Sequence, residues 1–133
     1  MLTLFMKTNS SSSREARMWL DGFSISYELK SIKNITHKEL VKILSLTDDG
    51  FEGVIIGHST ARAKQVRAFI YRKSFNEAVD FLVNHPELLR TPITLDQNKI
   101  QIGFVEGQMR TFIPREKRRV MKKKMDEELK NDV

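Results

Sequence analysis

The stretch LTLFMKTNSSSSREARMWLDGFSISYEL, residues 2–29, decides the fold. Its apolar start, residues 2–5, predicts a short strand, and residues 16–20 carry an apolar stripe at helical spacing. Residues 23–29 alternate between apolar and polar, which predicts a second, half-buried strand. A strand, a helix and a second strand joined in this way place the two strands parallel in one sheet.

Four consecutive serines, residues 10–13, lie between the first predicted strand and the helix. Ser12 and Glu15 fit a capping box, so we expect the helix to begin near Ser12 or Ser13. Asp21 and Gly22 are expected to end it, with Gly22 in a left-handed C-cap. Turns from a strand into a helix often carry reactive groups, and this turn offers only hydroxyls.

A helical segment follows the second predicted strand. Capping boxes at Thr36–Glu39 and Ser74–Glu77 predict the start of two helices, and residues 59–69 predict a basic helix between them. Asp49 and Gly50 are expected to stop the first of these helices.

A β-hairpin and a charged helix complete the chain. Residues 93–95 and 100–104 alternate on either side of a short polar turn, which predicts the hairpin. A short helix is expected at residues 106–112, and Pro114 suits the N1 position of a last helix. The order predicts an α/β, thioredoxin-like fold: a small mixed sheet with a helical insertion, in one domain over residues 1–133, with residues 114–133 as a charged C-terminal helix and tail.

The composition excludes several classes of protein. The 133 residues include no cysteine, which excludes thiolate catalysis and disulfides, and the three histidines show no short metal-ligand spacing. No apolar run approaches the roughly 20 residues that span a membrane, and no signal peptide is visible, so we expect a cytoplasmic protein without a cofactor. The net charge of +6 favours polyanionic or acidic partners, or simply a solvated helix face.

Several short motifs occur in a specific order. They are Ser-x-x-Ser-Arg-x-Ala-x-x-Trp-Leu at residues 10–20, Leu-Thr-Asp-Asp-Gly at 46–50, His-Pro-x-Leu-Leu-Arg-x-Pro-Ile at 85–93, Gln-x-Gly-Phe at 101–104 and Met-Arg-x-Phe-x-Pro-Arg at 109–115. With this order and spacing, the chain resembles the Spx/MgsR group of the arsenate-reductase-like (ArsC) family, whose members regulate transcription in low-GC Gram-positive bacteria.

The resemblance implies an ArsC-like fold and a partner. Proteins of this group bind the C-terminal domain of the RNA polymerase α subunit and act at promoters without a conventional DNA-reading motif. Here the resemblance implies polymerase contacts by Gly50, His58 and Arg62. Two basic sets could lie near promoter DNA phosphates: Arg62, Lys64 and Arg67, and, in the tail, Arg115, Lys117, Arg118 and Arg119.

The chain departs from the family pattern at four positions. Much of the family carries a Cys-x-x-Cys disulfide switch where Ser10 and Ser13 stand here, so we expect no thiol switch, whether the serines are natural or engineered. Thr91 stands where relatives carry an arginine before the proline, and Arg90 lies one residue earlier. Ser45 replaces another arginine that relatives carry. Without the cysteine nucleophile, the chain is not expected to be an enzyme.

Four further expectations stand alongside polymerase binding. The serine turn could bind an anion or phosphate, as a degenerate arsenate-reductase-like site contacted by Ser11, Ser12, Arg14, Arg17 and Arg90. The protein could instead act as a decoy that excludes an active paralogue from polymerase. By resemblance, the tail could be recognised by an ATP-dependent protease or its adaptor, and Pro92 is expected to be a cis-proline facing the turn.

Overall fold

The computed structural model describes residues 1–57 and 60–131. The strands are β1 (Leu2–Met6), β2 (Tyr27–Ser31), β3 (Ile93–Leu95) and β4 (Ile100–Ile102). The α-helices are α1 (Ser11–Gly22), α2 (His37–Leu46), α3 (Phe51–Val54), α4 (Ala61–Tyr71), α5 (Phe75–Asn84), α6 (Glu106–Met109) and α7 (Arg115–Asn131). Three short 3-10 helices are η1 (Ile32–Asn34), η2 (Pro86–Leu88) and η3 (Arg110–Phe112).

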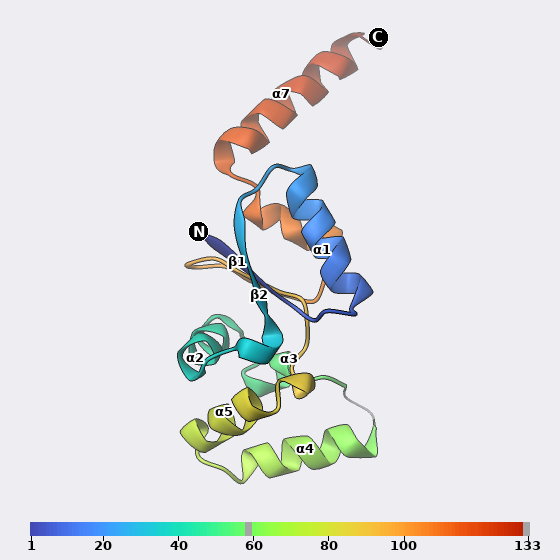
Figure 1. Cartoon of the computed structure of the whole chain (residues 1–133). Helices are drawn as coiled ribbons and strands as arrows, with labels where there is room; N and C mark the ends of the chain where they lie inside the picture. Colours follow the sequence, from blue (N-terminus) through green and yellow to red (C-terminus); the bar gives the residue numbers. More distant parts are fainter. Residues whose placement is uncertain (58–59, 132–133) are drawn as a thin grey trace.

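A mixed four-stranded sheet in the order β2-β1-β3-β4 forms the centre of the molecule. β1 pairs parallel with β2 and antiparallel with β3, so that Leu4 lies opposite both Leu29 and Thr94. β3 and β4 form the predicted hairpin. Figure 1 shows α1 and α6 beside the sheet, and α2 to α5 gathered below it as the helical insertion.

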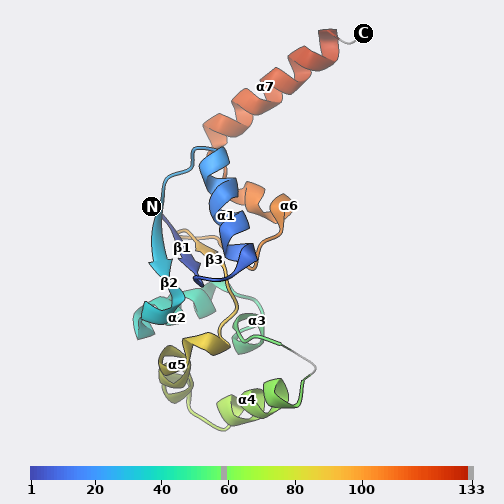
Figure 2. The same ribbon diagram turned by 45° about the vertical axis from the view of Figure 1, so that its right-hand side comes forward.

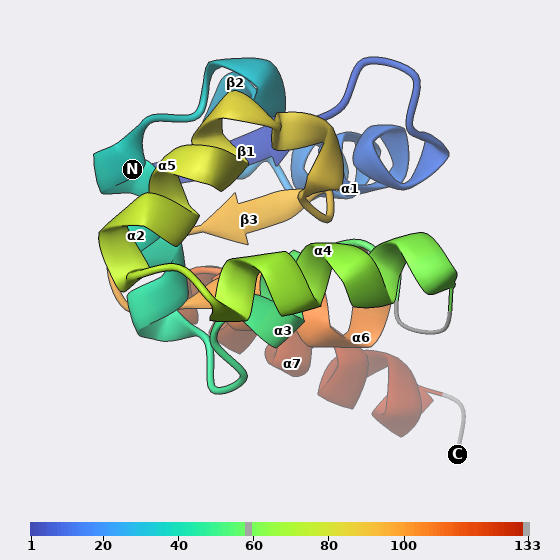
Figure 3. The ribbon, with the colours of Figure 1, turned by 90° about the horizontal axis from the view of Figure 1, so that it is seen from below.

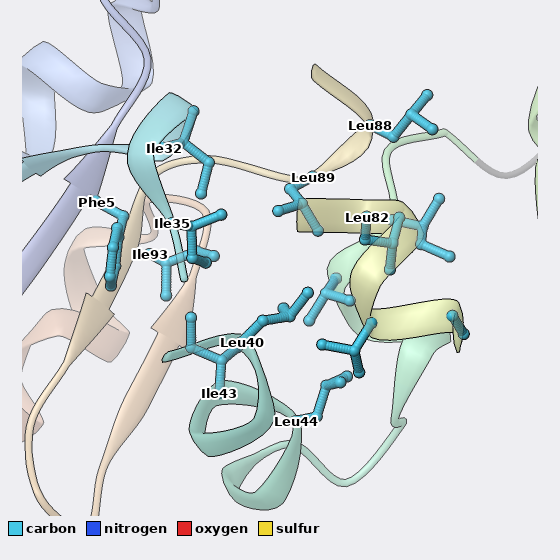
Figure 4. Packing of buried hydrophobic residues seen from close by; sticks show 14 of the residues in the cluster. Phe5, Ile32, Ile35, Leu40, Ile43, Leu44, Leu82, Leu88, Leu89 and Ile93 are labelled. Atoms are coloured by element: carbon cyan, nitrogen blue, oxygen red, sulfur yellow. The ribbon is translucent and has the colours of Figure 1, made fainter. Parts of the chain in front are cut away.

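Successive β1 side chains enter two separate hydrophobic clusters, as the two-residue period of a strand requires. Leu2 and Leu4 pack with α1 and with residues 109–113. Phe5 points to the other cluster, where it meets Ile93 and the insertion helices. Figure 4 shows this second cluster, with Phe5 and Ile93 on one side and Leu40, Ile43 and Leu82 approaching from the helices.

Both capping boxes of the helical insertion are confirmed: Thr36 and Glu39 cap α2, and Ser74 and Glu77 cap α5. Partial burial alone would raise the pKa of Glu39, but hydrogen bonds from Lys30 and Thr36 outweigh it and hold that pKa below its usual value. The ion pair between Lys30 Nζ and Glu39 Oε2, 2.8 Å long, also joins β2 to α2. The α2 cap therefore stabilises the fold most when Glu39 is ionised, and loses this contribution as pH falls through its lowered pKa.

Several predicted boundaries are wrong around α1. The helix begins at Ser11 with Ser10 as its N-cap, so the expected capping box at Ser12 does not form. The left-handed residue after the helix is Ser24, with φ 53°, and Gly22 lies inside the last turn. β2 begins at Tyr27 instead of residue 23, because Ser24 and Ile25 donate their N–H groups to Asp21 and Leu20 at the end of α1.

The last helix, α7, extends away from the sheet and the other helices (Figures 1 and 2). Its first turns are held by Lys117, whose Nζ donates to the carbonyl oxygens of Phe23 (2.9 Å) and Ser24 (2.7 Å). Lys117 was expected near DNA phosphates, but its ammonium group instead fastens α7 to the loop after α1. The end of the tail, residues 132–133, lies outside the described residues.

Replacement of Thr94 by valine is expected to stabilise the protein by about 1 kcal/mol. The Thr94 side chain in β3 is fully buried, and its hydroxyl has no hydrogen-bond partner among the described residues. Valine removes this uncompensated polar group at nearly the same volume. Urea unfolding followed by circular dichroism should show a higher midpoint for Thr94→Val, and a lower midpoint would mean that the hydroxyl does find a partner.

Candidate functional site

In the turn between β1 and α1, the hydroxyls of Ser10 and Ser13 both accept hydrogen bonds from backbone N–H groups. Ser10 Oγ accepts the N–H of Ser13 (3.2 Å), which satisfies one free donor of the helix start. Ser13 is fully buried, and its Oγ accepts the N–H of Lys7 (3.3 Å). Both serines therefore bond to backbone N–H groups, and neither hydrogen bond involves a histidine or carboxylate that would activate a serine nucleophile.

A polar hollow of about 510 Å³ opens beside this turn. Its lining residues come from the loop after β1, from the segment after α3 and from the segment before β3: Lys7, Asn9, Ser10, Ile56, Gly57, Leu89, Arg90 and Thr91. Thr91–Pro92 is a cis peptide bond, as the resemblance implied. The hollow thus gathers two cationic side chains with hydroxyl and amide groups beside the turn for which the resemblance implied a cysteine pair.

An isolated antiparallel bridge between Ile55 and Leu89 positions this hollow. The N–H of Ile56 donates to Leu88 O and the N–H of Arg90 donates to Val54 O, both at 2.8 Å. These bonds fix the end of α3 against the chain that enters β3. The helical insertion therefore supplies one wall of the hollow, which sequence spacing alone did not indicate.

The other predicted anion contacts lie elsewhere. Ser11 and Arg14 are exposed on α1, Ser12 is partly buried there, and none of the three lines the hollow. Arg17 interacts with the Tyr27 hydroxyl on β2. Burial and the hydrogen bond to Asp21 raise the pKa of Tyr27, while Arg17 acts in the opposite direction. Of the predicted anion set, the structure brings only Arg90 to the hollow, beside Ser10.

The predicted polymerase contacts lie on the helical insertion. Gly50 is the N-cap of α3 with φ 57°, so it starts a helix instead of stopping one. A Cβ atom built on Gly50 would meet no atom within 4 Å, so the space beside its backbone is open. Arg62 is exposed in the first turn of α4. The third predicted residue, His58, lies outside the described residues.

A second, apolar groove of about 400 Å³ runs beside Arg62. Its lining combines the segment after α3, the first half of α4 and η2: Ile55, Ile56, Gly57, Thr60, Arg62, Ala63, Val66, Glu87 and Leu88. Ile56 and Gly57 border both this groove and the polar hollow. The groove is therefore continuous with the polar hollow beside the serine turn. Together with Gly50, which lines neither of the two, the groove and Arg62 are named the α3–α4 surface.

The buried Arg67 joins α3 to α4, and its expected role near DNA phosphates is wrong. Only 8% of Arg67 is exposed, and its Nε donates to Glu52 Oε2 at 2.8 Å. Its Nη2 donates to Ile55 O at 3.2 Å, next to the bridge that walls the hollow. Tyr71 Oη donates to the same carboxylate (2.6 Å), which raises the pKa of Tyr71. Figure 3 shows α4 running along α3 at this junction.

The described residues contain neither a cluster of metal ligands nor a membrane-spanning helix. Within residues 1–57 and 60–131, no three histidine, aspartate or glutamate side chains gather in a way that would hold a metal ion. No helix in the same residues is both long and apolar enough to cross a membrane.

Comparison with known proteins agrees with the fold. The chain is 35% identical over 121 residues to the global transcriptional regulator Spx of Streptococcus mutans, covering 90% of this chain and 88% of that protein. The Spx protein of Streptococcus pneumoniae is also 35% identical, with 90% of each chain covered.

Solved structures share the thioredoxin-like, ArsC-like fold. A Staphylococcus aureus protein solved by NMR superposes with a TM-score of 0.70 at 23% identity, covering 84% of this chain and 97% of that one. An arsenate reductase from Vibrio cholerae gives 0.60 at 16% identity, with 76% and 87% covered. The sequence profile of the ArsC family matches residues 5–112. This chain belongs to the ArsC family, as a member that carries serine at both positions of the Cys-x-x-Cys pair.

Proposed function

We propose that this protein regulates transcription by binding the C-terminal domain of the RNA polymerase α subunit, without a thiol switch. The observation that carries the proposal is the similarity to Spx regulators over 90% of the chain, together with a turn that holds no nucleophile. In this proposal the protein regulates transcription through a surface that binds a partner, and not through a residue that reacts chemically.

The α3–α4 surface suits such a partner. Gly50 leaves open space beside its backbone, so a partner's main chain can approach closely. The groove beyond the other end of α3 is mostly apolar, and Arg62 in its lining offers a charged contact. Apolar contacts bordered by charge are the usual composition of a transient protein interface.

Promoter DNA would be contacted through phosphates only. Arg62 and Lys64 are exposed on α4, and Arg115, Arg118 and Arg119 are exposed on α7. Such side chains position a protein on DNA without reading the base sequence. In this proposal, promoter choice comes from polymerase, and the regulator alters how the α subunit engages it.

Substitution of Gly50 tests the proposed interface. Titration of the purified α C-terminal domain should show binding at tens of micromolar, and Gly50→Arg should weaken it by at least about tenfold, or 1.4 kcal/mol. Gly50→Ala is the matched control, because it strains the same positive-φ backbone without filling the open space. Calorimetry measures both variants, and equal losses for arginine and alanine would mean that strain, rather than contact, is responsible.

A second candidate function, anion binding, is favoured by one observation. Lys7 and Arg90 come from distant segments and line the same polar hollow with Ser10. Two cations and a hydroxyl form a suitable environment for a phosphate-like group. Calorimetric titration with phosphate, arsenate and nucleotides should show saturable binding if this is the function, and Arg90→Ala should abolish it; the absence of heat up to millimolar ligand rules it out.

A further inference from the structure

The last helix carries an apolar stripe that the rest of the described chain leaves largely exposed. At about 100° per residue, Met121, Met125 and Leu129 lie on one face of α7. Met125 is 60% exposed and Leu129 is 65% exposed, whereas Met121 packs partly against the α1 cluster. An apolar groove of about 400 Å³ lies along this stripe, bordered by Ile113 at the base of the helix and by Lys122 and Asp126 at its side.

The charges around this stripe are arranged symmetrically about Met125. The sequence MKKKMDEEL, residues 121–129, reads outward from Met125 as three lysines on one side and three acids on the other, and then as an apolar residue at each end. Within one helix this order gives only weak i,i+4 pairs, since a basic residue before an acidic one is the less favourable orientation with respect to the helix macrodipole. Within the described part of the chain, no ion pair involves a residue of α7.

A second copy of the same helix, running in the opposite direction, would cover the apolar stripe and place opposite charges next to each other. A two-fold axis through Met125 brings Met121 of one copy to Leu129 of the other, and Met125 to Met125. Lys122 and Asp126 share one side of the stripe, and Lys124 and Glu128 share the other. Antiparallel pairing therefore places each lysine within reach of an acid across the interface, whereas parallel pairing would place like charges together.

We propose that two copies of this chain associate through antiparallel pairing of α7 about Met125. The projection of α7 away from the sheet and the other helices leaves its stripe accessible to a second molecule (Figures 1 and 2). The partner's Leu129 would then seat beside Met121 and Ile113, in the groove described above. One helix pair is smaller than a standard protein interface, so the dimer is weak and reversible. This proposal is independent of polymerase binding.

Single introduced thiols test the geometry, because the chain has no cysteine of its own. Met125→Cys, Met121→Cys and Leu129→Cys chains are each equilibrated in a glutathione buffer, in which oxidised glutathione accepts the two electrons and two protons of each disulfide formed. Antiparallel pairing predicts a disulfide-linked dimer of the Met125→Cys chain alone. It also predicts cross-links between Met121→Cys and Leu129→Cys chains when the two are mixed, and mass spectrometry identifies each product.

Sedimentation velocity of the full chain provides the second measurement. The unmodified protein should show a concentration-dependent dimer that Met125→Glu removes and that Lys123→Glu, on the opposite face of α7, retains. Equal cross-linking of all three single-thiol chains would indicate parallel or random contact and overturn the proposal. A protein that sediments as a monomer at every concentration up to the millimolar range would also overturn it, leaving the stripe to a different partner.

Discussion

Replacement of Arg67 by alanine is expected to lower the free energy of unfolding by about 2 kcal/mol. The guanidinium group is almost fully buried, pairs with Glu52 and donates to the carbonyl oxygens of Ile55 and Ala63. Truncation therefore removes several charge-assisted bonds at once. It leaves the carbonyl oxygens of Ile55 and Ala63 in a buried region, whereas water can reach the Glu52 carboxylate, which is 42% exposed. Because Ile55 belongs to the bridge with Leu89, the loss should also loosen the wall shared by the groove and the polar hollow.

Urea unfolding measures this effect, with Arg62→Ala as the matched control on the same helix. Arg62 is exposed, so its replacement should change the unfolding free energy by less than about 0.5 kcal/mol. Arg67→Lys keeps the positive charge but lacks the planar guanidinium group with its several N–H donors. It should therefore lower the free energy of unfolding by less than Arg67→Ala, but not leave it unchanged. If the alanine variants at positions 62 and 67 unfold at the same midpoint, the buried network has no net effect on stability.

The local signals in the sequence determined most of the fold. The capping boxes of α2 and α5 and the alternation of the hairpin strands depend on residues three or fewer apart, and the structure confirms them. The parallel pairing of β1 and β2 followed from the single intervening helix. These features are governed by neighbours in the chain, and so a single sequence contains enough information to predict them.

Errors arose where several residues could do the same work. Any of the consecutive serines can cap a helix. Ser10 does so because its own N–H donates to Lys7 O at 3.1 Å, and the turn closed by this bond places Ser10 at the helix start. The alternation from residue 23 suggested a strand, but the N–H groups of Phe23, Ser24 and Ile25 are already used to end α1. Competition for these backbone groups depends on the three-dimensional turn, which the alternating pattern does not record.

The candidate site was only partly predictable for a related reason. The resemblance identified the serine turn, Arg90 and the cis-proline, since these belong to recognisable motifs. Arg67 carried no such signal, because an arginine in a basic helix has the same pattern whether it faces DNA or a buried carboxylate. Its partner Glu52 lies fifteen residues earlier, on another helix, and only tertiary packing brings the two together.

Installing cysteine at both serine positions is expected to give the protein an oxidant-dependent stability. In the reduced Ser10→Cys/Ser13→Cys protein, the N-cap is weakened at a cost of about 1 kcal/mol, and the larger sulfur must fit the fully buried place of Ser13. A disulfide closing this short loop should then add about 2 kcal/mol by restricting the unfolded chain. Oxidation should therefore restore roughly what the substitutions remove.

Urea unfolding with and without diamide, which takes up the two electrons and two protons released, measures this difference. The unmodified chain provides the baseline: it has no thiol, so its midpoint should not respond to diamide. Each single cysteine variant controls for the loss of one hydroxyl without the bond. If the double variant keeps two free thiols after oxidation, the turn does not have the geometry of a disulfide pair. The shape of the loop from Lys7 to Ser10, in addition to the serine side chains, would then be what prevents a disulfide in this turn.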